Sequence, residues 1–163
     1  MRRPCGFKIT VGFVRVIGLC VRMAKKGRPA AHAVVVEGTF DAPVHIDQFE
    51  LSSMEHEVAT QLRDLASGLR SRIAGLKPDR VVIRRADLAR VASNKEGPRL
   101  RLLAEGALAA GARDEISDVV VLTGRDLGVR AAVSKGDLDT AAAHKLPGLP
   151  PEAAAAALVG LVP

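Results

Sequence analysis

The chain has 163 residues, 48% of them hydrophobic but only 2% aromatic, and a formal net charge of +6. This length fits one domain, residues 1–163, with a core built mainly from Ala, Val, Leu and Ile. Charged residues interrupt every apolar stretch before it reaches the roughly 18 residues of a membrane span, and no cleavable signal peptide is apparent. We therefore expect a cytoplasmic protein without membrane partners.

The charge is unevenly distributed along the chain. Residues 1–30 contain eight Lys or Arg and no acid, whereas residues 31–60 contain six Asp or Glu and no Lys or Arg. A basic segment releases counterions when it meets phosphates, which gives a salt-dependent affinity for nucleic acid. The same charges would also protect the open edge of a hairpin from pairing with another chain. Charge alone leaves both interpretations open.

Three antiparallel strands are predicted in the first third of the chain. Residues 8–24 are rich in apolar and β-branched residues, a turn follows at 24–29, and extended character resumes at residues 33–36. Residues 44–51 then alternate apolar and polar side chains, which is the pattern of a strand with one wet face. Cys5 and Cys20 have neither CxxC nor metal-ligand spacing, so we expect reduced, buried thiols.

Helices and strands alternate in the rest of the chain. Ser52 and Glu55 have the spacing of a capping box, and apolar residues then recur at helical intervals from Val58 to Leu76. The later predicted elements are a strand at 80–84, a helix from Pro98 to about Gly111, a strand at 118–122, a short helix or turn at 124–133, and a terminal helix from Pro150 to Leu161. Because strand–helix–strand connections are right-handed crossovers, the last two strands should be parallel neighbours.

This order of elements resembles the ribonuclease H-like superfamily, and three stretches resemble its RuvC-type Holliday-junction resolvases. These stretches are Lys77–Ile83, Leu122–Val133 and Glu152–Leu158. The resemblance implies an α/β fold with a mixed five-stranded sheet, in which three antiparallel strands precede strands that alternate with helices, and with flanking helices.

The resemblance also implies which positions would hold catalytic carboxylates. Family members that cut nucleic acid use such carboxylates to hold two divalent cations, Mg²⁺ or Mn²⁺. The family pattern has an Asp in the first strand, a Glu at the end of the fourth and an Asp in the last helix. This chain has Cys20, Arg84 (or Arg85 if the register slips by one) and Glu152 there. We therefore expect a degenerate site with no metal, no other cofactor and no catalytic residue.

Loss of the metal ligands need not remove the surface that docks a nucleic acid, because backbone recognition rests on distributed positive charge. Our first hypothesis is a catalytically inactive domain that binds DNA or RNA through phosphate contacts. The candidate residues are Lys25, Lys26, Arg28, Arg84, Arg85, Lys95, Arg99 and Arg101. The competing explanation is that Arg84 or Arg85 pairs with Asp87 or Glu152 and closes the former site.

Two other functions stay open. The chain could be a structural subunit that forms a homodimer or joins a larger complex, since the alanines at 153–157 permit close helix approach. It could also be a metal-dependent endonuclease with relocated acids. The acids considered are Asp47, Glu50, Asp87 and Asp118. Alternation along the strand puts Asp47 and Glu50 on opposite faces, so ordinary surface carboxylates are the simpler interpretation.

Overall fold

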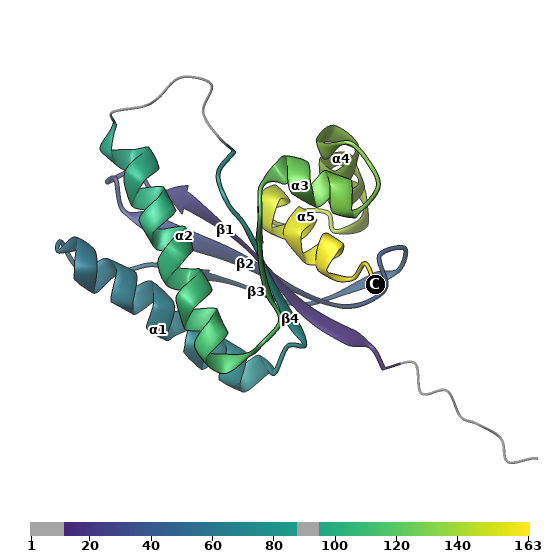
Figure 1. Ribbon diagram of the computed structural model, residues 1–163, viewed down its shortest axis with the longest axis horizontal. Helices are drawn as coiled ribbons and strands as arrows, with labels where there is room; N and C mark the ends of the chain where they lie inside the picture. The colour runs from purple at the N-terminus through teal and green to yellow at the C-terminus, as the bar shows by residue number, and fades with distance from the viewer. Residues whose placement is uncertain (1–11, 88–94) are drawn as a thin grey trace, which may run out of the picture.

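A computed structural model describes residues 12–87 and 95–163. Five strands form one mixed sheet in the spatial order β3-β2-β1-β4-β5 (Figure 1). The strands are β1 (Val14–Met23), β2 (Pro29–Gly38), β3 (Pro43–Leu51), β4 (Arg80–Arg84) and β5 (Val119–Leu122). The helices are α1 (Val58–Leu76), α2 (Glu96–Glu115), α3 (Gly124–Arg130), α4 (Lys135–Lys145) and α5 (Pro151–Gly160). Within these described residues, no helix combines the length and apolar composition needed to cross a membrane.

Strand β1 lies at the centre of the sheet. It pairs antiparallel with β2 and parallel with β4, while β3 extends the sheet beyond β2 and β5 beyond β4. The predicted mixed sheet and the parallel pairing of β4 with β5 are confirmed. Because β1, β4 and β5 run in the same direction, their C-terminal ends meet at one edge of the sheet, where open α/β sheets usually bind ligands.

Helices cover both faces of the sheet. Figure 1 shows α1 and α2 on one face and α3, α4 and α5 on the other. Successive side chains of β1 alternate between the two layers: Ile17 and Leu19 belong to the core formed with α1 and α2, whereas Val16 and Cys20 belong to the core formed with α5. Cys20 is thus buried, as predicted, and Cys5 lies outside the described residues.

Helix α5 packs very closely on β1. A Cβ atom on Gly18 would lie 2.2 Å from the backbone nitrogen of Ala157 and 2.3 Å from the carbonyl oxygen of Ala153. Only glycine at this position permits the approach. The alanines at 153–157 are at most 1% exposed, so they form part of the core. The suggestion that they offer a surface for a partner is therefore wrong.

The helix cap predicted at Ser52 is wrong, whereas the helical interval predicted from Val58 to Leu76 is confirmed. Helix α1 begins at Val58, and the carboxylate of Glu57 caps it by accepting a hydrogen bond from the backbone nitrogen of Thr60 at 3.1 Å. Ser53 donates a hydrogen bond to Asp64 at 2.7 Å and is buried. Ser53 therefore fixes the segment that precedes the helix, and Glu57 supplies the cap.

Helix α2 begins before Pro98 and continues past Gly111, so its predicted end is wrong. A Cβ atom on Gly111 would lie 3.0 Å from the carbonyl oxygen of Ala66 in α1. This glycine allows α1 and α2 to pack closely and does not terminate the helix.

The alternation predicted for β3 is interrupted by a bulge. Val35 of β2 faces Asp47, but the next residue, Val36, faces His45, so Ile46 is an extra residue in the edge strand. Ile46 is accordingly 41% exposed, whereas Phe49 is only 8% exposed. Such a bulge disfavours further pairing at the edge of a sheet.

Candidate functional site

The three positions singled out by the family pattern lie together at the C-terminal ends of β1 and β4. Cys20 and Arg84 are register partners on these neighbouring parallel strands, and both are buried. Glu152, in the first turn of α5, acts electrostatically on both of them, since its charge raises the pKa of each. Because α5 also packs against both β1 and β4, the three elements meet in one site.

Arg84 forms an ion pair with α4. Its Nη1 atom donates a hydrogen bond to Oδ1 of Asp139 at 2.7 Å. Burial lowers the pKa of the guanidinium, but the hydrogen bond and charge of Asp139, helped by Glu152 and Asp87, outweigh it, and the net pKa is raised. Arg84 thus stays a cation, and its partner is Asp139 instead of the Asp87 or Glu152 considered from the sequence.

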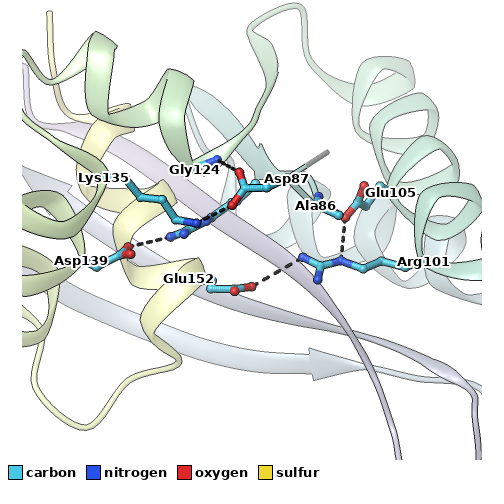
Figure 2. Close-up of polar contacts among 9 residues, drawn as sticks. Ala86, Asp87, Arg101, Glu105, Gly124, Lys135, Asp139 and Glu152 are labelled. Carbon is cyan, nitrogen blue, oxygen red and sulfur yellow. Dashed lines mark hydrogen bonds and ion pairs between the residues drawn. The ribbon is translucent and has the colours of Figure 1, made fainter. Parts of the chain in front are cut away.

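Arg101 links two helices that lie on opposite faces of the sheet. Its Nε atom donates to Oε1 of Glu105 at 3.0 Å, and its Nη2 atom lies 3.6 Å from Oε2 of Glu152, an ion-pair distance too long for a hydrogen bond. Figure 2 shows this guanidinium between the two carboxylates. Arg101 therefore bridges α2 and α5 past the end of the sheet.

Glu105 is a buried acid at the same edge. It is only 3% exposed, and its Oε1 atom also accepts a hydrogen bond from the backbone nitrogen of Ala86, just after β4, at 2.8 Å. Burial raises the pKa of Glu105 against the opposing effects of Ala86 and Arg101. The carboxylate thus holds the end of β4 against α2.

Asp87 ties the end of β4 to the helices on the other face. It accepts hydrogen bonds from the backbone nitrogen of Gly124 at 3.1 Å and from Nζ of Lys135 (Figure 2). The hydrogen bond from Lys135 is the main reason that the pKa of Asp87 lies below its usual value. Asp87 therefore stays ionised and paired.

These side chains do not fit a two-metal site. Magnesium and similar cations need oxygen ligands, and of the three family positions only Glu152 supplies a carboxylate. Burial, followed by the charge of Glu152, raises the pKa of the Cys20 thiol to about 11, so the thiol stays protonated. Residues 12–87 and 95–163 contain no group of three or more His, Cys, Asp or Glu side chains placed to hold a metal ion.

The acids considered as replacement ligands are dispersed. Their closest basic partners are Arg80 for Asp118 at 2.8 Å, Arg72 for Asp47 at 4.0 Å, and His32 for Glu50 at 3.7 Å. Asp118 precedes β5 and so lies at the N-terminal ends of the parallel strands, whereas Asp87 follows β4 and lies at their C-terminal ends. The positions of these acids therefore do not support a relocated metal site.

Basic side chains lie around the C-terminal ends of β1 and β4, where the segments that follow these two strands begin. We define the basic rim as Lys25, Lys26, Arg28, Arg85, Lys95 and Arg99. Lys25 and Lys26 lie in the turn after β1, and the start of α2 approaches this turn, since a Cβ on Gly97 would lie 4.0 Å from Cγ of Met23. The other two residues predicted to bind nucleic acid are not part of the rim. Arg84 is buried, and Arg101 has 24% of its side chain exposed and two acidic partners.

Asp139 and Lys135 were missed from the sequence because α4 was not recognised as a separate helix. The available signal was Ser134 followed by Asp137, a capping pattern. The Ser134 hydroxyl does accept a hydrogen bond from the backbone nitrogen of Asp137 at 3.1 Å. Glu105 was also visible as the i+4 partner of Arg101.

The sequence matches no protein-family model and no curated protein. Solved structures do match. The structure of Thermus thermophilus RuvC has a TM-score of 0.66 and 14% sequence identity, and the alignment covers 90% of this chain and 92% of that one. Thermus thermophilus RuvC in complex with a Holliday junction substrate gives a TM-score of 0.65 and 13% identity, with 90% and 91% covered. This likeness shows the fold: the chain has a ribonuclease H-like α/β fold, as predicted.

Proposed function

We propose that the chain is a single ribonuclease H-like domain that binds DNA or RNA through the basic rim and does not cut it. The observation that carries this proposal is the pairing of Cys20 with Arg84 at positions where the RuvC resemblance places carboxylates. The Holliday junction bound by Thermus thermophilus RuvC supports a nucleic-acid ligand for a chain of the same fold.

The charges inside the site support the absence of cutting. Four acids around the Cys20–Arg84 pair each have a basic partner. The pairs are Asp139 with Arg84, Asp87 with Lys135, and both Glu105 and Glu152 with Arg101. A cation entering beside one of these guanidinium groups meets a repulsion of about 4 kcal/mol per unit-charge pair at close range, with an effective dielectric constant near 20. Internal ion pairs thus take the place of metal coordination.

The charges outside the site support binding. Lys25 and Lys26 are exposed, and neither they nor Arg28 has a carboxylate partner within the described part of the chain. Cations without a carboxylate partner, such as Lys25 and Lys26, favour contact with phosphates, whose counterions are released on binding. Because such contacts are made to the backbone, they do not depend on the lost carboxylates.

A binding and cleavage assay tests this proposal. Labelled four-way junction, duplex and single-stranded DNA and RNA are titrated at two salt concentrations, with Mn²⁺ or with a chelator. We expect salt-sensitive binding that is equal in both conditions, and intact nucleic acid throughout. Mn²⁺-dependent cleavage that Glu152→Ala abolishes would instead establish a nuclease.

A matched pair of variants identifies the binding surface. Lys26→Asn removes one charge from the basic rim. The control Lys77→Asn removes an equal charge at the C-terminal end of α1, on the opposite side of the sheet from the rim. Asparagine is suitable there because Lys77 has a left-handed backbone conformation (φ 49°), which asparagine tolerates. We expect Lys26→Asn to reduce the slope of log affinity against log salt by about 1. Lys77→Asn should leave it unchanged, and equal effects of the two variants would contradict the proposed surface.

One observation favours the alternative function, an assembly subunit. Leu102 and Leu103 are adjacent on α2 and each is 53% exposed, and exposed apolar patches mark association surfaces. Light scattering of the wild type and of Leu103→Glu tests this alternative. An oligomer that is indifferent to nucleic acid and that the substitution dissociates would support assembly over nucleic-acid binding.

A further inference from the structure

A hollow of about 300 Å³ lies between the turn that follows β1 and the segment that joins β3 to α1. Its apolar lining includes Pro29, Ala30 and Met54, and its basic lining is Lys25, Lys26 and Arg28. Figure 1 shows the end of β1 and the start of α1 on the same side of the molecule. The hollow thus continues from the basic rim and is separate from the Cys20–Arg84 pair.

Arg28 is held in place across this hollow. Its Nη1 atom lies 3.9 Å from Sδ of Met54, and its Nη2 atom lies 3.2 Å from Nδ1 of His56, so the guanidinium joins the turn to the segment before α1. Arg84 and Arg101, by contrast, are paired with carboxylates. The acidic residue in the lining, Glu50, lies 3.7 Å from His32. The hollow therefore presents a surplus of positive charge beside an apolar wall.

This combination suits one chemical class of ligand. A phosphate matches the lysines and Arg28, while a flat ring with a π face matches the guanidinium plane and the thioether of Met54, which is 79% exposed. A nucleotide with an unpaired base carries both groups. Bases within a duplex are stacked and cannot enter a pocket without being flipped out.

We propose that this hollow receives an unpaired nucleobase while Lys25, Lys26 and Arg28 contact the adjoining phosphates. The inference rests on the proposed nucleic-acid binding and names the preferred form, a single-stranded segment. Stacking on side chains tolerates all four bases, so the preference is for the unpaired state and not for a sequence.

The chain offers a clean test because it contains no Trp and no Tyr. The variant Met54→Trp places a single indole at the hollow. The control variant Val129→Trp places a single indole on α3 instead, at a residue that is 72% exposed. Each variant is titrated with single-stranded oligothymidine, with the same strand lacking its bases, and with duplex DNA. Anisotropy of a labelled strand measures binding independently.

We expect base stacking to quench the fluorescence of Met54→Trp only with the base-containing single strand, and to leave Val129→Trp unchanged. Met54→Ala should weaken binding of that strand about fivefold and leave the abasic strand unaffected. Salt-sensitive binding without quenching, together with equal affinity for both strands in the wild type, would overturn the hollow as a base site and leave the proposed function standing. If no strand binds at any salt concentration, both proposals are wrong.

Discussion

Arg84 and Asp139 connect the end of β4 to α4 by a hydrogen-bonded ion pair, with 2.7 Å between Nη1 and Oδ1. The side chain of Arg84 is 5% exposed and that of Asp139 is 37% exposed. A buried cation that loses such a partner keeps its desolvation penalty and loses the compensation. The two residues should therefore respond differently to substitution.

Asp139→Ala should lower the free energy of unfolding by about 2 kcal/mol, because it leaves Arg84 buried and unpaired. Arg84→Met removes the charge but keeps most of the side-chain volume, so in this background Asp139→Ala should cost less than about 0.5 kcal/mol. Urea denaturation of the four proteins measures both values. An equal cost of Asp139→Ala in the two backgrounds would refute the pairing.

Glu105 should make stability depend on pH. Its pKa is raised in the folded state, so this group favours folding at pH values below its unfolded pKa, near 4.3, and that contribution is lost as the pH rises through the folded pKa. Glu105→Gln removes this titration. The free energy of unfolding of the variant, relative to the wild type, should therefore increase from acid to neutral pH.

Denaturation curves at several pH values measure this difference. Glu96→Gln provides the control, since Glu96 is an exposed acid in the first turn of the same helix. A difference between Glu105→Gln and the wild type that stays constant with pH would count against the raised pKa.

Gly18→Ala should be strongly destabilising. The added Cβ would lie within 2.6 Å of three backbone atoms of α5, which cannot rotate away as a side chain can. We expect a loss of about 3 kcal/mol or more in the free energy of unfolding. The matched change Gly106→Ala, in α2, meets nothing within 4 Å and should stabilise the protein by roughly 0.5 kcal/mol or more. Thermal denaturation distinguishes the two variants.

The Cys20 thiol should be unreactive in the folded protein, because it is buried and its pKa is about 11. In a Cys5→Ser background, alkylation by iodoacetamide at pH 8 should be at least about 100-fold slower in buffer than in urea. Mass spectrometry of quenched samples gives both rates. Similar rates in the two solvents would show that Cys20 is accessible.

Placing acids at the positions that the RuvC resemblance assigns to carboxylates tests whether Cys20 and Arg84 prevent metal binding. The double variant Cys20→Asp, Arg84→Glu adds two acids beside Glu152 and removes the central cation. Mn²⁺ should raise its melting temperature by about 5 °C or more at a concentration on the order of 100 times Kd. The wild type should show no such change, and an equal rise in both proteins would contradict the degenerate-site proposal.

The sheet could be predicted from the sequence because its strands are marked locally. The strand at 80–84, for example, is bounded by Pro78 and by arginines, and its predicted limits match β4. The ion pairs and hydrogen bonds of the candidate site could not be predicted, because they join elements that are distant in sequence. Arg84 and Asp139 are 55 residues apart, and which acid reaches the arginine depends on how α4 packs beside α5.

The capping and helix-end errors have a different cause. The spacing of Ser52 and Glu55 satisfies a local rule, yet Ser53 bonds to Asp64 and the helix starts later. Gly111 satisfies the rule for a helix stop, yet it serves the contact with Ala66. In both places tertiary packing overrides a local preference.

The central position of β1 has a consequence for how the chain folds. The β1–β3 hairpins can form as soon as they leave the ribosome, but the parallel partner of β1 is encoded much later, since Arg15 and its partner Asp79 are 64 residues apart. Until β4 has been synthesised, the hairpins formed by β1–β3 have an unpaired, strongly apolar edge at β1. Such an edge favours association with other chains. Closure of the loop containing α1 is thus the expected slow step of folding, because chain entropy is lost before the distant strand contributes its contacts.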